Sequence, residues 1–361
     1  MAADPSTIQA INTVCAGPSS GSTGPTSFRK LVAADVPSGC GFVNVLRNST
    51  FVSWPNGTSG SIYTSGSGSG LIAANGWAVE GASADSTWQQ EALGHNGTYY
   101  SLRLTGATGN TDETVRQRIG GSDGAKIAGQ RCTFQAAIYN STGASLTPQL
   151  STYYANSFEN FSATTTDLSA TNLQSIANGA WGIVAYTFDV SSSASNGYGI
   201  LVDFGAITSN SNYVQITATD LRVTTGVATG LNSSPPVPEL PYLAYELERN
   251  AVYYRTSYAN GTAPGTSFTA GSAAQPEFFS DGSHYLVGYV PFNVPMRASP
   301  TLTVYDEAGN SSKVSGYYSS AWHDSIALTS STPGAQGFAF QSSSTSPLYT
   351  QFGYSAYADF W

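Results

Sequence analysis

The stretch Trp181-Gly-Ile-Val-Ala-Tyr-Thr-Phe-Asp-Val190 indicates a β fold, because it is rich in β-branched and aromatic residues in an alternating pattern. Similar runs occur at Tyr100–Leu104, Cys132–Ile138 and Tyr213–Val223. Period-two alternation is typical of strands that bury one face. The whole region from residue 41 to residue 225 is therefore predicted to be a two-sheet β-sandwich of the jelly-roll type.

Turn residues punctuate this region at short intervals. Asn-Gly pairs supply the positive φ angles that tight hairpins need. These pairs begin at Asn56, Asn75, Asn96, Asn178 and Asn196. No segment of the sandwich has a long helical period, and the short run Thr171–Ile176 is its best helical candidate. The predicted fold class is all-β.

The remainder of the chain divides into three parts. Residues 1–40 are a mostly irregular leader, in which Phe28, Leu31 and Val32 have helical spacing and predict an amphipathic turn or two. We expect this leader to dock on other subunits. Residues 226–241 contain a cluster of prolines and form a stiff linker. Residues 242–361 begin like a helix and continue as strands, which predicts a second, C-terminal β-sandwich in tandem with the first.

Composition excludes several classes of function. The net charge is −9 and the sequence pI is about 4.7, which argues against binding to nucleic acid or to an anionic membrane. No apolar run is long enough to insert in a membrane. Charged residues make up only 10% of the chain, against roughly 25% in average domains, so the surface must consist of uncharged polar residues. Such surfaces suit extracellular or virion proteins.

Three cysteines, Cys15, Cys40 and Cys132, fit no metal-binding spacing and are expected to be free thiols. The N-terminus has neither the basic region nor the apolar core of a signal peptide. A surface of extracellular character on a chain without an export signal is expected of a virion component that is assembled in a host cytoplasm and released by lysis.

Several motifs, taken in order, resemble phage tail-fibre and head-spike proteins, the receptor-binding proteins of these particles. Asn44-Val-Leu-Arg-Asn-Ser-Thr-Phe-Val-Ser-Trp54 followed by Ala74-Asn-Gly-Trp77 resembles the opening of their carbohydrate-binding-like jelly rolls. The runs Pro238–Arg255 and Val290–Tyr305 are similar to their C-terminal domain. The resemblance covers roughly residues 25–361, and the head spikes of phage-like gene transfer agents are a close variant.

This resemblance implies a fibre or spike on the virion surface, on either a tail or a capsid, that attaches the particle to a bacterial host. It further implies a homotrimer, with residues 1–40 bound to other virion proteins. The expected ligand is a surface or capsular polysaccharide of the host cell. A structural decoration or adaptor protein that binds no sugar is the alternative, and a polysaccharide depolymerase is a third possibility.

Aromatic residues in or beside polar loops are the predicted sugar-binding groups, because rings stack on the apolar faces of pyranoses. We expect Trp54, Trp77 and Trp181 to belong to the core. For Trp88 and the pair Tyr153-Tyr154, core and ligand roles are about equally favoured. The candidate carbohydrate-binding residues are Trp88, Tyr99, Tyr153, Tyr154, Phe158, Tyr317, Tyr318 and Trp322.

We expect no catalytic residues and no enzymatic activity. The chain has no Gly-x-Ser-x-Gly elbow between a strand and a helix. The adjacent carboxylates Asp112 and Glu113 could in principle cleave glycosides, but their polar surroundings favour a solvated loop. The resemblance to jelly-roll modules also suggests a structural calcium at Asp220, although the acidic partner usual in the first strand is absent and calcium prefers six to eight oxygen ligands.

Overall fold

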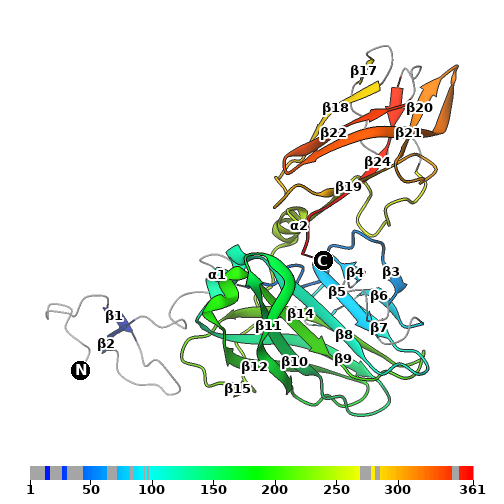
Figure 1. Ribbon diagram of the computed structural model, residues 1–361. Coiled ribbons are helices and arrows are strands. Elements are labelled where there is room, and N and C mark those ends of the chain that lie inside the picture. Colours follow the sequence, from blue (N-terminus) through cyan, green and yellow to red (C-terminus); the bar gives the residue numbers. More distant parts are fainter. Residues whose placement is uncertain are drawn as a thin grey trace.

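The computed structural model describes residues 13–16, 27–30, 44–62, 71–81, 85–92, 94–95, 97–268, 278–280, 285–343 and 349–360. Antiparallel sheets dominate these residues, which confirms the predicted all-β class. Two β domains follow one another along the chain and are seen one above the other in Figure 1.

The larger domain is a sandwich of two sheets. The first has the strand order β11-β10-β13-β8-β5-β4. Its strands are β4 (Leu71–Ala74), β5 (Trp77–Gly81), β8 (Glu113–Ile119), β10 (Gln149–Ser157), β11 (Asn160–Asn172) and β13 (Tyr198–Asp203). The second has the order β15-β12-β9-β14-β7-β6-β3. Its strands are β3 (Ser59–Ser61), β6 (Thr87–Ala92), β7 (Tyr100–Thr105), β9 (Arg131–Ser141), β12 (Ala180–Asp189), β14 (Tyr213–Val223) and β15 (Gly230–Leu231).

The core of the sandwich lies between these sheets and includes Trp54 and Trp77, as predicted. The glycines of the Asn-Gly turns have positive φ angles, for example +80° at Gly76 and +75° at Gly179, which only glycine adopts without strain. The turn chemistry of the sequence therefore fixes the strand ends.

The smaller domain contains a three-stranded sheet and a six-stranded sheet, ordered β16-β24-β19 and β17-β18-β22-β21-β20-β23. Their strands are β16 (Tyr254–Thr256), β17 (Phe278–Ser280), β18 (Tyr285–Pro291), β19 (Thr301–Tyr305), β20 (Lys313–Tyr318), β21 (Ala321–Gly334), β22 (Gly337–Ser342), β23 (Tyr349–Gln351) and β24 (Gly353–Tyr357). Phe338, Phe340 and Phe352 pack together in its core.

Three local predictions were wrong or incomplete. Phe28 belongs to β2 (Ser27–Lys30), which pairs with β1 (Thr13–Ala16), so the predicted amphipathic turn is not helical at its first residue. Leu31 and Val32, the other two residues of that prediction, lie outside the described residues. The candidate Thr171–Ile176 is not helical: Thr171 and Asn172 end strand β11, and Ile176 forms an isolated bridge with Leu146. Helix α1 (Gly121–Ile127) and a 3-10 helix at Ser192–Asn196 were not predicted, since their glycine and serine content gives no helical signal.

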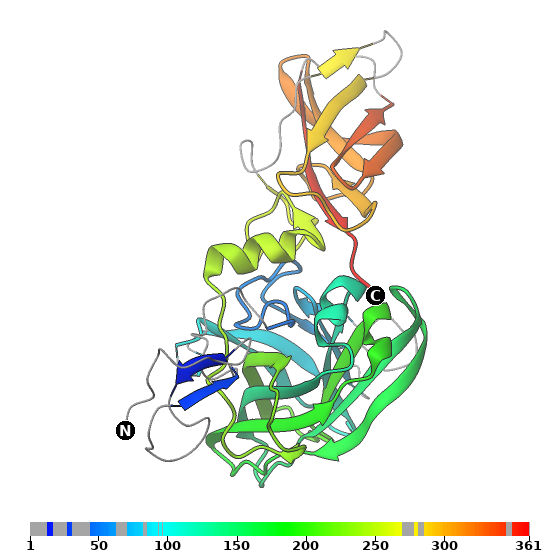
Figure 2. The same cartoon turned by 90° about the vertical axis from the view of Figure 1, so that its left-hand side faces the viewer.

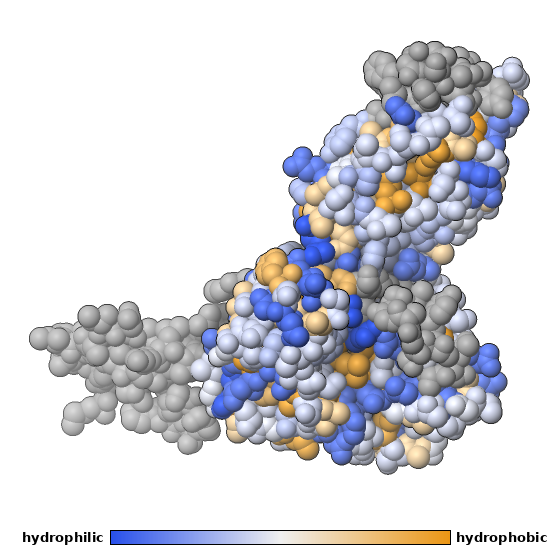
Figure 3. All heavy atoms as spheres, viewed as in Figure 1, coloured by the Kyte–Doolittle hydropathy of each residue, from blue (hydrophilic) through white to orange (hydrophobic). Residues whose placement is uncertain are grey.

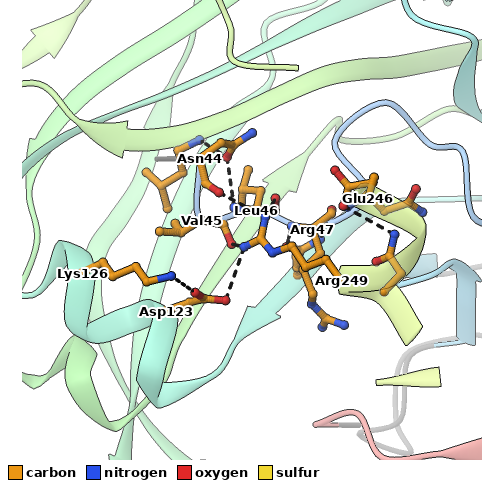
Figure 4. Close-up of polar contacts among 12 residues, drawn as sticks. Asn44, Val45, Leu46, Arg47, Asp123, Lys126, Glu246 and Arg249 are labelled. Carbon is orange, nitrogen blue, oxygen red and sulfur yellow. Dashed lines mark hydrogen bonds and ion pairs between the residues drawn. The ribbon is translucent and has the colours of Figure 1, made fainter. Parts of the chain in front are cut away.

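Helix α2 (Leu243–Ala251) connects the domains, and Tyr254 begins the next strand, as the sequence predicted. Figure 4 shows Arg249 of α2 reaching the start of the sandwich. Its guanidinium donates to the carbonyl oxygens of Asn44 at 3.1 Å, Val45 at 2.8 Å and Leu46 at 2.8 Å, and it pairs with Asp123 of α1 at 3.3 Å. One side chain thus satisfies four acceptors in the sandwich.

A buried ion pair ties the end of the chain to the same region. Arg47 lies 2.8 Å from Asp359, and both side chains are about 1% exposed. The guanidinium of Arg47 also lies 3.5 Å from the ring centroid of Tyr253, and Figure 2 shows the C-terminus beside the sandwich. Because a buried charge is costly without its partner, these contacts hold the two domains in one arrangement.

The proline-rich linker lies against the sandwich instead of spanning open solvent as a spacer. Its strand β15 pairs with β12. The carbonyl oxygen of Pro236 accepts a hydrogen bond from Gln135 at 2.8 Å, and that of Val237 accepts one from Arg222. The linker therefore covers part of the outer face of the seven-stranded sheet.

The surface has the uncharged character expected from the composition. In Figure 3 pale residues of intermediate hydropathy cover much of both domains, with hydrophilic and apolar residues scattered among them. Within the described residues, neither helix has the length and apolar content that a bilayer crossing requires.

Candidate carbohydrate-binding face

The seven-stranded sheet has a core face and an outer face, and the side chains of each strand point to these two faces in alternation. In β9, Phe134, Ala136 and Ile138 belong to the core. Because successive side chains of a strand point to opposite faces, Tyr139 lies on the outer face. The same alternation places Trp181 of β12 there, since Val184 of that strand lies in the core.

Strand register brings residues distant in sequence into one row across this outer face. Trp181 is paired with Tyr139, Tyr139 with Gln215, Gln215 with Arg103 and Arg103 with Gln89. Directly opposite residues on adjacent strands have neighbouring side chains on the same face. The row therefore combines two aromatic rings with three polar side chains.

A third ring extends the aromatic part. The ring centroids of Tyr139 and Trp181 are 5.5 Å apart, and those of Tyr139 and Tyr213 are 5.9 Å apart. All three side chains are half-buried, so each ring is packed in place and still reaches the surface. We call the surface formed by Trp181, Tyr139, Tyr213, Gln215, Arg103, Gln89 and Glu91 the aromatic face.

Polar side chains of the aromatic face are fixed by mutual contacts. Arg103 donates to Glu91 at 2.8 Å, and its guanidinium lies 3.8 Å from the centroid of the Tyr213 ring. Gln89 donates to the same carboxylate at 2.6 Å. Ser101, which is buried, donates to the side-chain oxygen of Gln215 at 3.0 Å. These contacts hold amide and carboxylate groups beside the rings before any ligand arrives.

The connection between β6 and β7 borders the aromatic face. Its residue His95 stacks on Trp181 with the ring centroids 5.1 Å apart. Partial burial lowers the pKa of His95, which favours the neutral imidazole. Tyr99 of the same connection, a predicted binding residue, is 64% exposed. The structure thus brings one predicted residue into the segment beside the aromatic face.

The other end of this sheet face is occupied by the chain itself. Asp220 is fully buried there, with Arg222 at 3.2 Å, Gln135 donating at 3.0 Å and the backbone N–H of Glu239 donating at 3.2 Å. Burial raises the pKa of Asp220 to about 6. Across the described parts of the chain, no three His, Cys, Asp or Glu residues are grouped as metal ligands. The contacts of Asp220 assign it to anchoring the linker.

Trp88, a predicted binding residue, lies in the core and cannot stack on a sugar. It is 2% exposed, and its ring centroid lies 5.9 Å from that of Trp54. Gln89 and Glu91 of the same strand face outward, because successive side chains of a strand point to opposite faces of the sheet. Gly60 is its cross-strand partner, and a Cβ atom there would come within 2.8 Å of the Trp88 ring nitrogen.

The predicted residues of β10 have mainly packing roles. Tyr154 packs against the main core. Tyr153 packs with Phe161 in the small cluster that also contains Tyr253 and Phe360. Phe158, in the turn after β10, is 67% exposed but lies on the other sheet of the sandwich. These residues do not share a surface with the aromatic face.

The remaining predicted residues lie in the C-terminal domain. Trp322 is 38% exposed, and its ring meets the half-buried Tyr317 edge-on at a centroid distance of 5.5 Å. Tyr318 ends strand β20, and its side chain is outside the described residues. The predicted residues are thus distributed over both domains and do not form one site.

The carboxylates Asp112 and Glu113 do not form the solvated loop that was expected. Glu113 is fully buried, and Asn110 donates to it at 2.7 Å. Burial, with a further contribution from Asp112, raises the pKa of Glu113 to about 7. Burial and the neighbouring Asp203 raise that of Asp112 to about 6. Because Glu113 has no exposed surface, it cannot contact a polymer chain in this structure.

Sequence reasoning missed the residues that carry the aromatic face. Trp181 was predicted to be core, but the apolar residues Ile183 and Val184 point to opposite faces of β12, so composition alone leaves the parity of that strand open. Tyr139 follows the alternating run Cys132–Ile138, and Tyr213 begins the run Tyr213–Val223. The alternation in these runs could have indicated that both side chains face outward. Their convergence with Arg103 depends on pairing between strands far apart in sequence.

Comparisons with known proteins give only distant likenesses. No protein-family model and no curated protein matches the chain. Among solved structures, the CBM22-1–GH10 modules of the Clostridium thermocellum endo-1,4-beta-D-xylanase 10B match at 10% identity and a TM-score of 0.34, covering 52% of this chain and 30% of that one. The enzymatically active domain of Bacteriophage CBA120 tailspike protein 4 matches at 13% identity and a TM-score of 0.34, covering 50% of this chain and 22% of that one.

A single module gives a similar result. The CBM22-2 xylan-binding domain of Paenibacillus barcinonensis Xyn10C matches at 11% identity and a TM-score of 0.31, covering 43% of this chain and 94% of that one. This chain spans less than a third of the length of the first two structures. At these levels of similarity, the role of the aromatic face has to be argued from its own geometry.

Proposed function

We propose that the sandwich domain binds polysaccharide through the aromatic face. The observation that carries the proposal is the row of half-buried rings, Trp181, Tyr139 and Tyr213, on one outer sheet face. Rings stack on the apolar faces of sugars, while amides and carboxylates hydrogen-bond hydroxyl groups. Gln89, Gln215 and Glu91 are such groups within the same face.

The charges of the aromatic face favour a neutral glycan. Arg103 and Glu91 form an ion pair at 2.8 Å, so the formal charges of the two groups cancel. The His95 imidazole beside Trp181 has a lowered pKa and stays neutral near pH 7. A neutral chain meets no unpaired charge among these residues, and its hydroxyls can replace water at the fixed amides.

The wider role proposed here is attachment of a virion to a bacterial host. Support comes from the ordered sequence resemblance to phage fibre and head-spike proteins, together with the low content of charged residues. In this proposal the protein is displayed as a homotrimer, and its leader contacts other virion proteins. The sandwich binds the host polysaccharide without cleaving it. The interdomain contacts of Arg249 and Arg47 would hold the two modules in a fixed orientation on the particle.

The test uses the full-length chain and affinity electrophoresis through gels containing host capsular polysaccharide. We expect Trp181→Ala and Tyr139→Ala each to weaken binding about five- to tenfold, because one aromatic contact contributes about 1 to 1.5 kcal/mol. Trp322→Ala is the matched control, since it removes an exposed ring in the other domain. Binding that depends on Trp322 and not on Trp181 would overturn the assignment of the site. Absence of binding to any host polysaccharide would favour a structural decoration role, and depolymerised product would identify an enzyme.

A further inference from the structure

A second concave site lies in the C-terminal domain, away from the aromatic face. The cavity has a volume of about 590 Å³, within the range of small-molecule sites. Its walls come from the loop after β16, the hairpin turn after β19 and strand β21. The lining residues are Tyr258, Ala259, Thr262, Ser267, Phe268, Glu307, Ala308 and Asp324.

Two carboxylates give this cavity a negative charge. Glu307 and Asp324 both line it, and among the lining residues that the structure describes there is no lysine, arginine or histidine. Within the described part of the chain neither carboxylate forms an ion pair. Partial burial and the nearby Asp324 raise the pKa of Glu307. The cavity therefore carries two like charges that a cation would relieve.

One serine links the Asp324 carboxylate to the backbone of Glu307. The hydroxyl of Ser315, which is fully buried, donates to Asp324 at 2.6 Å and accepts the backbone N–H of Glu307 at 2.7 Å. The backbone N–H of Phe268 donates to the carbonyl oxygen of Glu307 at 3.0 Å, which joins the aromatic wall to the acidic wall. The cavity is therefore held in shape by the domain itself.

The rings of Tyr258 and Phe268 also line the cavity. Tyr258 meets Phe268 and Tyr305 edge-on at centroid distances of 5.9 and 6.0 Å. Ring faces attract cations, and they also pack on the apolar face of a sugar. Thr262 and Ser267 add hydroxyl groups to the lining. The lining thus combines anionic acceptors, ring surfaces and hydroxyls.

A metal ion fits this lining poorly. Calcium prefers six to eight oxygen ligands. The described lining residues supply two carboxylates, and one of them already accepts the Ser315 hydroxyl. The neighbouring Asp306 is fully buried, and its oxygens accept hydrogen bonds from Asn310 and from the backbone of Ser325. Asp306 is therefore committed to the turn.

We propose that this cavity binds an amino sugar with a free primary ammonium group. The ammonium group pairs with Glu307 and Asp324, and the sugar ring packs against Tyr258 and Phe268. Hydroxyl groups of the sugar can form hydrogen bonds with Thr262 and Ser267. An alkyl ammonium ion has no hydroxyl groups and would leave these two residues without partners. This site is separate from the aromatic face and does not depend on the function proposed for it.

The experiment is isothermal titration calorimetry of the full-length chain with glucosamine, N-acetylglucosamine, glucose and calcium chloride. We expect glucosamine to bind at pH 6, where its amine is protonated, and to lose at least tenfold in affinity at pH 9.5. N-acetylglucosamine and glucose should bind at least tenfold more weakly at pH 6. Equal binding of N-acetylglucosamine, absence of glucosamine binding, or tight calcium binding would each overturn the proposal.

Variants locate the site. Glu307→Gln and Asp324→Asn should each weaken glucosamine binding at least tenfold at pH 6, with unchanged thermal unfolding as the check on folding. Glu248→Gln removes an exposed carboxylate of α2 and is the matched control. Trp181→Ala should leave glucosamine binding intact, because it alters only the aromatic face. An unchanged affinity in both cavity variants would also overturn the proposal.

Discussion

Replacing Glu113 by glutamine is expected to change how stability depends on pH. Glu113, the first residue of β8, is fully buried, and burial raises its pKa from 4.5 to about 7. A carboxyl group with a raised folded-state pKa favours folding while it is protonated. Its contribution is complete below pH 4.5 and is lost as pH rises through 7. Glutamine has a similar shape and cannot ionise, so Glu113→Gln removes this loss.

The difference between the two pKa values sets the magnitude. At pH 8 the variant should be more stable than the wild type by up to about 3 kcal/mol, and at pH 4 the two should be nearly equal. Glutamine keeps an oxygen that can accept the Asn110 hydrogen bond, which measures 2.7 Å in the wild type. The local packing is therefore expected to survive the substitution.

The assay is urea unfolding at several pH values between 4 and 8, followed by the fluorescence of the buried rings Trp54, Trp77 and Trp88. Asp112, whose pKa is also raised, is present in both proteins, so it largely cancels from the difference. Glu248→Gln should follow the wild type throughout. A difference that does not change with pH, or that is largest at pH 4, would refute the reasoning.

Three other perturbations test the packing and the linker. Trp88→Ala should destabilise the sandwich by about 3 to 5 kcal/mol in urea unfolding, because it leaves a cavity in the core. Weakened sugar binding with unchanged stability would contradict the core position of Trp88. Asp359→Ala leaves the buried Arg47 without its partner and should cost about 3 to 5 kcal/mol, whereas a loss below 1 kcal/mol would mean that the pair does not hold the domains together. Calcium or EDTA should leave the melting temperature unchanged, because the carboxylate of Asp220 is held by Arg222 and Gln135. A rise in melting temperature with calcium would instead support a structural calcium at Asp220.

The all-β class and several of the long strands could be predicted from the sequence alone. Alternation along Cys132–Ile138 predicted β9, and the Asn-Gly pairs predicted turns whose glycines do have positive φ angles. These features are local, because strand alternation and turn conformation depend on a few neighbouring residues. The helical start of the C-terminal part was predicted for the same reason, from the run at Tyr242.

The location of the candidate site could not be predicted from the sequence, because it depends on pairing between distant strands. Pairing of β12, β9, β14 and β7 places Trp181 beside Tyr139 and Gln215 beside Arg103, although these strands are far apart in the chain. The local sequence pattern also does not show which face of β12 is buried, since both of its faces carry apolar residues. The packing of the linker onto the sheet, which buries Asp220, likewise depends on non-local contacts that no short stretch of sequence specifies.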